Sequence, residues 1–298
     1  MNIRNFSGRH LLLVLALWLL GALQYFWGAS FFERLRTDYF AETFYAAKCQ
    51  AHQTPTAPVE EFESVVRRRD QTLNSDEARS VIQGDMHWLT PAGVVIFEVQ
   101  GLYGVDRRTR ENLPGYGNEA RTGQFLFPPH TERKTYGQWN PHYAGPHVAT
   151  FDHDEKLGSL PVYVFNFLAD GIDETLGYAS LPDVPEKYRA LTYGKGRIWI
   201  EPQSGLVVDY EDGGVSYFVD PKTGERVAEI LKWSDRYLPE TRTARLRLAS
   251  RERWRIFALE RGLPGALMLA GLVWAACGLR PKKKPLRAQG AAGLLEIA

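Results

Sequence analysis

Two uncharged apolar segments, one near each end of the chain, constrain its fold more than any other feature. Residues 11–29 and 262–279 contain no charged side chain. At about 1.5 Å of rise per residue, each segment as a helix nearly crosses a hydrocarbon core of roughly 30 Å. The sequence therefore predicts transmembrane helices over residues 11–29 and 262–279. A cleaved signal peptide is the alternative for the first segment, although bulky Tyr25, Phe26 and Trp27 stand where small cleavage-site residues would be expected.

The basic tails indicate how these two spans are oriented. Two spans place both termini on one side of the membrane, and the tails carry the basic residues Arg4, Arg9, Arg280, Lys282, Lys283, Lys284 and Arg287. Arginines also flank the spans on the other side, but long translocated loops are discounted and the first span usually dominates. We therefore expect a two-pass protein of a bacterial inner (plasma) membrane, with both tails, residues 1–10 and 280–298, in the cytoplasm and the main domain extracytoplasmic.

The charge of the intervening body restricts its partners. The formal charge of the whole chain is +1, while residues 1–29 contribute +2 and residues 261–298 contribute +5, so residues 30–260 carry 1 − 2 − 5 = −6. Nucleic-acid binding needs an excess of basic residues on one face, so we expect no nucleic-acid partner. Cys277 lies in the second span and Cys49 outside it, so a disulfide between them would be hard to close.

The hydrophobic pattern between the spans changes from helical to alternating and back. Apolar residues at helical spacing predict a stalk helix and linker over residues 30–58. Short strands joined by Gly- and Pro-rich turns predict a β-rich extracytoplasmic domain over residues 59–238. Pro239 marks the start of an Arg-rich stalk helix over residues 239–261. The predicted fold class is mainly β, as an antiparallel β-barrel or a strongly curved sheet with short helices, plus one transmembrane α-helix at each end.

The clearest local pattern runs from Arg197 to Val227. Apolar and polar residues alternate on each side of three turns, which predicts a hairpin meander. We expect Gly205, Gly213 and Gly224 at turn positions that need a positive φ.

Few residues in the chain suggest a catalytic, nucleotide-binding or metal-binding site. No P-loop, HExxH, GxSxG or cysteine pair at metal spacing occurs. One segment gathers residue types that can ligate metals, namely His142, His147, Asp152, His153, Asp154 and Glu155. Their irregular spacing, with Pro and Gly nearby, predicts an exposed loop rather than a metal site, and no pattern places two carboxylates in one pocket. We therefore expect no enzyme activity, no metal and no cofactor.

Three segments carry a family resemblance. YGQWNPHYAGPHVATFDHDEKLGSLPVYVFNF (136–167), VDRRTREN and RIWIEPQSGLVV together resemble the bacterial porin PorA family. The resemblance covers most of residues 59–233 and both terminal spans. It implies a membrane protein of the bacterial envelope. The word porin is a poor guide to mechanism, because long apolar helices stop in the inner membrane and outer-membrane barrels avoid them.

A second resemblance is shorter. KLGSLPVYVFNF resembles a segment of the class B scavenger receptors, the family of the lysosomal integral membrane protein, in which an aromatic strand follows a Gly-x-Pro turn. Those receptors also have a span at each end, and their outer β-barrel encloses a lipid tunnel. The resemblance implies a similar barrel. The shorter outer segment of this chain, without the disulfides of those receptors, departs from their pattern.

Aromatic residues suggest a binding module for a lipid or another apolar ligand. The expected lining of such a site is Trp139, Tyr143, Tyr163, Phe165, Phe167 and Trp199. The alternative is that these aromatics simply fill a closed barrel. Arginines beside the second span are expected to meet lipid headgroups, namely Arg251, Arg253, Arg255 and Arg261.

Two other functions stay open. Two spans leaving one folded domain could transmit a displacement, so a sensor acting through a partner membrane protein is one alternative. A structural envelope protein without a ligand is the other. The expected partners are the bilayer, a bound lipid, and a partner membrane protein or further copies of this chain.

Overall fold

The computed structural model describes residues 8–28, 31, 33–118, 120–140, 145–178 and 184–278. The chain divides into two compact units. Met1–Ala29 and Ala258–Ala298 form the first, and Ser30–Phe257 form the second.

The first unit is a pair of helices. Helix α1 (Gly8–Leu23) continues into a π-helical turn, η1 (Gln24–Gly28), and a second π-helical turn, η3 (Ala258–Gly262), leads into α5 (Leu263–Gly278). The indole of Trp18 donates to the carbonyl of Met268 (3.2 Å), and a Cβ on Gly271 would lie 2.5 Å from that indole nitrogen, so only glycine permits this approach.

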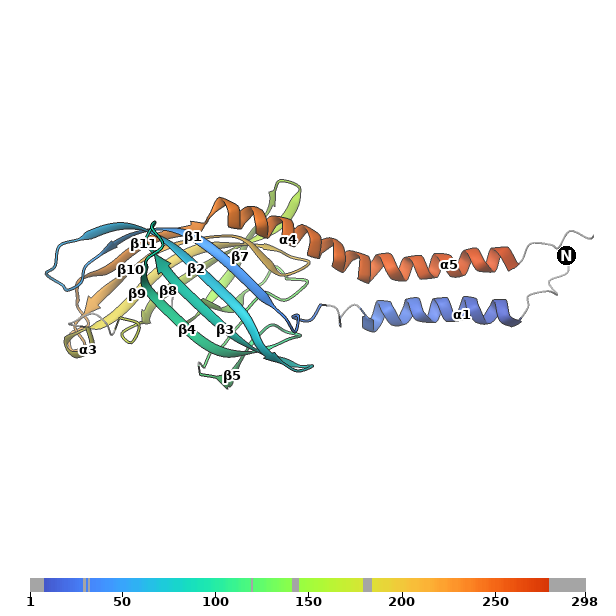
Figure 1. Ribbon diagram of the computed structural model, residues 1–298, viewed down its shortest axis with the longest axis horizontal. Coiled ribbons are helices and arrows are strands. Elements are labelled where there is room, and N and C mark those ends of the chain that lie inside the picture. The colour runs from blue at the N-terminus through green and yellow to red at the C-terminus, as the bar shows by residue number, and fades with distance from the viewer. Residues whose placement is uncertain are drawn as a thin grey trace, which may run out of the picture. The chain divides into compact units, whose positions relative to one another are not determined.

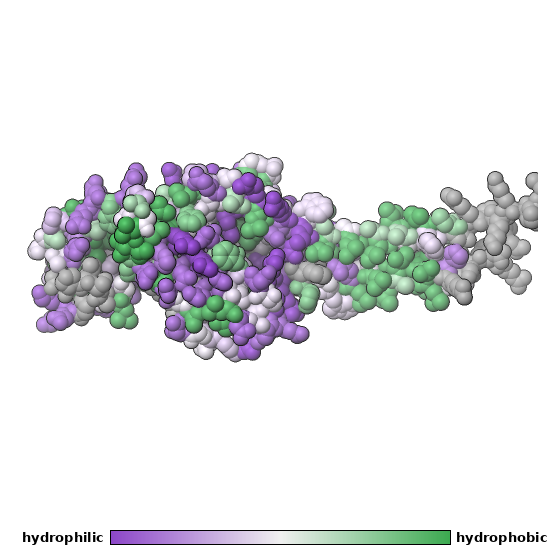
Figure 2. Space-filling view, viewed as in Figure 1, coloured by the Kyte–Doolittle hydropathy of each residue, from purple (hydrophilic) through white to green (hydrophobic). Residues whose placement is uncertain are grey.

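The described surface of these helices is largely apolar (Figure 2). Two helices of the chain, His10–Gly28 and Pro239–Cys277, are long and apolar enough to cross a membrane. The sequence predicts an apolar helix at each end of the chain, and the structure confirms both helices.

The second unit is an antiparallel sheet of eleven strands (Figure 1). The strands are β1 (Phe40–Ala51), β2 (Glu60–Ser75), β3 (Arg79–Leu89), β4 (Val95–Asp106), β5 (Asn112–Gly117), β6 (Tyr136–Asn140), β7 (Gly145–Leu157), β8 (Leu160–Asp173), β9 (Arg189–Glu201), β10 (Leu206–Val219) and β11 (Arg226–Tyr237). Their spatial order is β5-β4-β3-β2-β1-β11-β10-β9-β8-β7-β6. All neighbours are consecutive in sequence except β1 and β11, whose pairing joins the two ends of the sheet-forming chain.

The sheet does not close into a barrel. Strands β5 and β6 are its two edges, and the chain between them meets both at Gln124, which bridges Glu111 on one side and Gln138 on the other. The same segment inserts Phe125 and Phe127 among the buried apolar residues, so it fills the interior instead of forming a twelfth strand. The prediction of an antiparallel, mainly β fold is confirmed. Of the two predicted forms, a barrel or a strongly curved sheet, the barrel is wrong because the sheet is not closed.

The predicted stalk helix over residues 30–58 is also wrong, because Phe40–Ala51 form strand β1. Thr43, Tyr45, Ala47 and Cys49 are buried in alternation, which is the period of a strand. Strand β1 pairs along its length with β2, and from Tyr45 to Ala51 it also pairs with β11. The spacing of the aromatic residues here fits both a helix and a strand. The segment forms a strand because it pairs with β2 and β11.

The predicted meander is confirmed as β9, β10 and β11. Gly205 (φ 71°) and Gly224 (φ 73°) hold the expected left-handed turn positions. Gly213 is a correction, because it lies within β10, between Lys195 of β9 and Ser234 of β11. A Cβ there would lie 3.0 Å from the Trp233 carbonyl oxygen, so this glycine permits close packing rather than a turn.

The two faces of the sheet pack against different partners. One face carries an aromatic core that includes Phe127, Phe165 and Phe167. The opposite face packs against α4 (Pro239–Phe257) through Ala249, which lies among Val164 and Trp199. The predicted helix start at Pro239 is confirmed, but α4 lies on the sheet and belongs to its compact unit instead of standing off as a stalk. A short helix, α3 (Val184–Lys187), completes the described elements of this unit.

Candidate functional site

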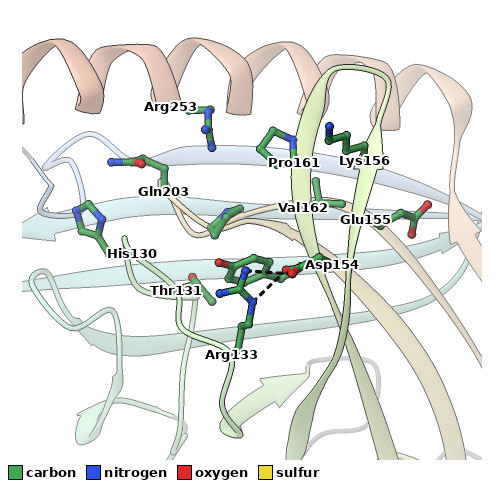
Figure 3. A pocket seen from close by; sticks show the side chains of 12 residues that line it. His130, Thr131, Arg133, Asp154, Glu155, Lys156, Pro161, Val162, Gln203 and Arg253 are labelled. Carbon is green, nitrogen blue, oxygen red and sulfur yellow. Dashed lines mark hydrogen bonds and ion pairs between the residues drawn. The ribbon is translucent and has the colours of Figure 1, made fainter. Parts of the chain in front are cut away.

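A cleft of about 680 Å³ lies beside α4, between the β7–β8 hairpin, the segment 128–134 and the β9–β10 turn (Figure 3). Its lining residues are His130, Thr131, Arg133, Asp154, Glu155, Lys156, Pro161, Val162, Tyr163, Pro202, Gln203 and Arg253. The walls combine prolines, a valine and a tyrosine with charged groups of both signs. A cleft of this size and mixed lining suits a small amphipathic molecule.

Backbone hydrogen bonds fix one wall of the cleft. The amide of His130 donates to the carbonyl of Gln203 (3.1 Å), and the amide of Thr131 donates to that of Pro202 (2.8 Å). The turn itself needs Gly205, because a Cβ at that position would lie 2.2 Å from the carbonyl oxygen of Phe127. The segment 128–134 and the β9–β10 turn are therefore held together as one wall.

Glu201 anchors α4 to this wall. Its carboxylate is fully buried and accepts hydrogen bonds from the amide (2.8 Å) and the hydroxyl (2.7 Å) of Ser204. Its other oxygen pairs with the guanidinium of Arg253 at 2.9 Å. A buried carboxylate is tolerated only when it is paired and hydrogen-bonded, so this pair fixes the place of Arg253 over the cleft.

The β7–β8 hairpin supplies the opposite wall. Arg133 forms an ion pair with Asp154 (3.0 Å), and its guanidinium lies 4.6 Å from the ring centroid of Tyr163. Figure 3 shows Arg133 and Asp154 joined by dashed lines that mark this ion pair. The hydrogen bond to Asp154 raises the pKa of Arg133 above its ordinary value.

Two neighbouring charges of this hairpin differ in their partners. The carboxylate of Glu155 accepts a hydrogen bond from the indole of Trp199 at 2.8 Å. Lys156 is exposed and has no ion-pair partner among the described residues. The other basic side chains of the lining are paired with carboxylates. Lys156 is therefore the basic side chain of the cleft that is most accessible to an anion.

The six aromatic residues expected to line one site do not come together. Tyr163 lines the cleft, whereas Phe165 and Phe167 are packed into the aromatic core, with exposed fractions of 0% and 3%. Trp199 lies on the opposite face of the sheet, against α4. Strand side chains alternate between faces, and the sequence does not show which face is open. Phe165 and Phe167 do not line this cleft, which corrects the prediction that they share one site with Tyr163. Phe167 borders a second cavity, of about 930 Å³, together with Asn166 and Arg197.

The two remaining aromatic residues of the predicted site, Trp139 and Tyr143, are not found in the cleft among the described residues. Trp139 lies on β6 with the guanidinium of Arg121 at 5.5 Å from its ring centroid, away from the cleft. Tyr143 lies outside the described residues.

The four arginines that were expected to contact lipid headgroups do not form one group either. Arg253 lines the cleft, and Arg255 pairs with Glu252 at 2.7 Å. Arg251 is exposed on α4, and Arg261 belongs to the other unit. Arg253 and Tyr163, drawn from two different predicted groups, are therefore the residues that the structure places in one cleft.

The metal-ligating residue types lie on a strand, which corrects the predicted exposed loop. His147 is buried on β7, 4.9 Å from Phe167 between ring centroids, whereas His153 is exposed next to Asp152 (2.9 Å). His142 lies outside the described residues. His147 and His153 thus occupy different surroundings along one strand.

Several cleft residues were not foreseen from the sequence, including His130, Arg133 and Gln203. They stand in or beside turns, and their neighbours in the cleft are distant in sequence. The available signal was the proline-rich segment FPPHTER, which marks a fixed loop but not its partners.

The comparisons with known proteins give the family. The family model described as Porin PorA matches residues 41–280, well over half of the chain. The chain belongs to this family. The first resemblance read from the sequence is thereby confirmed. Neither this match nor the solved structure described next is a class B scavenger receptor, so the second resemblance stays an expectation.

Two further comparisons add little to the PorA assignment. A solved structure from Bacteroides fragilis, provisionally described as an exported protein with a YmcC-like fold, is 8% identical, with a TM-score of 0.21. The similarity covers 68% of this chain and 97% of that one, and at this TM-score it carries no argument. A search of the curated proteins finds no match.

Proposed function

We propose that this PorA-family chain is a membrane-anchored, extracytoplasmic binding protein whose cleft takes an amphipathic anion, such as a lipid with an acidic headgroup. The observation that carries the proposal is the lining of the cleft. Three basic groups, on Arg133, Lys156 and Arg253, come from three separate parts of the chain to surround walls that include Val162 and Tyr163. A site of this composition offers apolar contact and charge-assisted hydrogen bonds to one ligand.

The packed aromatic core narrows the class of ligand. A purely apolar molecule would need an apolar cavity, and Phe165 and Phe167 are covered by other side chains. The cleft presents prolines and one tyrosine beside charged groups, and an apolar tail alone would leave the ammonium group of Lys156 without an anionic partner. An acidic headgroup seated at Lys156 supplies that partner. We propose binding without catalysis, and with no metal or other cofactor.

The first experiment identifies what the protein carries. The full chain is extracted in a maltoside detergent, and its copurifying small molecules are measured by mass spectrometry. The proposal predicts enrichment of an acidic lipid over the bulk membrane composition. Recovery of lipids in the same proportions as the membrane would contradict it.

The second experiment tests the cleft directly. The full chain in maltoside micelles is titrated with a single-chain alkyl phosphate, followed by tryptophan fluorescence, because Trp199 contacts Glu155 of the lining. Lys156→Gln should weaken binding about fivefold, which corresponds to about 1 kcal/mol for one partly solvated charge contact. Lys222→Gln, an exposed change at the β10–β11 turn, is the matched control and should bind as the parent does. Equal loss in both variants would place the binding outside the cleft.

The placement of the chain in the envelope is part of this proposal. Two helices long and apolar enough to span, together with the basic tails, support a two-pass protein with cytoplasmic termini. Protease added to intact spheroplasts should degrade the sheet domain and spare an N-terminal cytoplasmic tag. Protection of the domain until lysis would reverse the orientation. The sensor and structural alternatives remain predictions, and each would need a partner membrane protein or further copies of the chain.

A further inference from the structure

The edge of the sheet at β4 is left open over half its length. Strand β5 pairs with β4 only from Tyr103 to Val105. The pairing ends at Leu102, whose amide bonds to the side chain of Asn118 (2.6 Å) and whose carbonyl accepts from the Asn118 amide (3.0 Å). Among the described residues, no strand pairs with the outer side of Val95–Gln100, here called the open edge.

The backbone alternation shows which groups face outward along the open edge. In an antiparallel ladder, a residue directs both its amide and its carbonyl to the same neighbouring strand, and the next residue directs them to the other. Leu102 directs both groups away from β3, and the register with β3 is regular from Phe97 onward. The amides and carbonyls of Gln100 and Glu98 therefore also point to the open side, as a template for a further strand.

The side chains of this region are apolar and exposed. Val94, Val95, Ile96 and Phe97 have exposed fractions of 63%, 48%, 47% and 39%. No charged residue occurs from Trp88 to Phe97, and between Val95 and Gln100 the strand contains no proline or lysine and a single charged residue, Glu98. Sheet edges of soluble domains carry such protection when they are not covered.

We propose that the open edge of β4 is the docking site for an extended segment of another polypeptide, which adds to the sheet as a strand. Backbone hydrogen bonds to Glu98 and Gln100 supply its alignment, and apolar side chains cover Val95 and Phe97. Glu98 is exposed at the edge, next to His87 of β3 (3.6 Å), so the incoming strand carries a basic residue opposite it. The added strand occupies the row that β5 would fill if it continued along β4.

Two other occupants are less well suited. A lipid surface offers no partner for the outward amides and carbonyls, and acyl chains disfavour such unsatisfied groups. A second copy of this chain would place Glu98 opposite its own equivalent in the register centred on this residue, and like charges directly opposite destabilise a strand pair. The experiment below distinguishes a lipid surface and a second copy of this chain from the proposed polypeptide strand.

The test uses the full chain in nanodiscs and a synthetic probe. The probe is a blocked ten-residue peptide of alternating valine and threonine with one central lysine, and its matched control carries proline at alternate positions and cannot form a strand. Binding is measured by fluorescence anisotropy. Amide exchange is measured in parallel, since the amides of Glu98 and Gln100 should become protected only when the first peptide is present.

The decisive pair of variants is Gln100→Pro and Gln100→Ala. Proline removes an amide that faces away from β3, so it blocks strand addition without removing a β3–β4 hydrogen bond, whereas alanine keeps the amide. We expect Gln100→Pro to weaken probe binding about tenfold or more, and Gln100→Ala to retain it. Glu98→Lys should shift preference to a peptide with a central glutamate. Circular dichroism and thermal unfolding check that each variant is folded.

Three results would overturn the proposal. Probe binding that is equal in Gln100→Pro and Gln100→Ala excludes strand addition at this edge. Concentration-dependent dimers that Gln100→Pro abolishes, with no probe binding, assign the edge to a second copy. Attachment to protein-free vesicles that Ile96→Lys abolishes and Gln100→Pro retains assigns it to lipid.

Discussion

Glu174 should make the stability of the sheet domain fall as pH rises. It is nine-tenths buried at the end of β8, where its carboxylate accepts a hydrogen bond from the hydroxyl of Thr192. Thr192 is in turn hydrogen-bonded to Ser216 (2.7 Å), which also contacts the hydroxyl of Tyr178 (3.1 Å). Burial disfavours the charged form and raises the pKa of Glu174 from 4.5 to about 7, against a smaller opposing contribution from Thr192.

The sign and size of the effect follow from proton linkage. Between pH 4.5 and about 7, the folded chain holds a proton that the unfolded chain has released. The free energy of unfolding is therefore fully retained below this window and decreases as pH rises through it. At about 1.4 kcal/mol per pKa unit, the total loss is about 3 kcal/mol. Asp235, whose pKa burial raises to about 6, adds a loss of the same sign.

The comparison with Glu174→Gln isolates the contribution of Glu174. Glutamine keeps an acceptor for Thr192 and cannot ionise, while Asp235 stays in both proteins. Guanidinium unfolding of the full chain in detergent, followed by near-UV circular dichroism, should give similar stabilities at pH 4. At pH 8 the variant should be more stable than the parent by about 3 kcal/mol. Stability curves that run parallel from pH 4 to pH 8 would refute the assignment of this titration to Glu174.

Three further predictions concern the packing of the domain. Gly205→Ala should destabilise by about 2 kcal/mol or more, because alanine is strained at φ 71° and its Cβ would meet the Phe127 carbonyl; a neutral effect in chemical denaturation would contradict the turn geometry. Phe165→Ala, at a fully buried position, should cost about 3–5 kcal/mol by the same measurement, while Leu168→Ala at an exposed position of the same strand should cost under about 1 kcal/mol. Burial raises the pKa of the Cys49 thiol to about 11, so at pH 7.5 iodoacetamide should alkylate it far more slowly in the folded than in the unfolded chain; equal rates would show that the thiol is exposed.

The hairpins were predictable from the sequence because their signals are local. In β9–β10–β11 the alternation and the turn residues lie within a few positions of each other, so Gly205 and Gly224 could be assigned to turns in advance. Phe40–Ala51 could not be assigned in this way. Its aromatic spacing fits two periods, and its pairing with β11 depends on residues almost the whole domain away in sequence.

The candidate site was only partly predictable, for a related reason. Tyr163, Phe165 and Phe167 share one face of β8 by alternation, which the sequence shows. What the sequence does not show is where the covering segment lies: Phe127 packs on Phe165 (5.2 Å between ring centroids), so that end of the face is filled, while Tyr163 meets Arg133 at the cleft. Positions on one face of a single strand therefore differ in exposure, because a residue of a distant loop covers Phe165.

The same loop links the stability of the domain to the cleft. Gly205 lets the β9–β10 turn approach Phe127, and this turn holds Glu201, whose buried carboxylate fixes Arg253. A change at Gly205 must displace either the loop or the turn, and both are walls of the cleft. Loss of ligand binding in Gly205→Ala should therefore accompany its loss of stability, whereas Lys156→Gln should lose binding alone. This separation follows because Lys156 lines the cleft without supporting it.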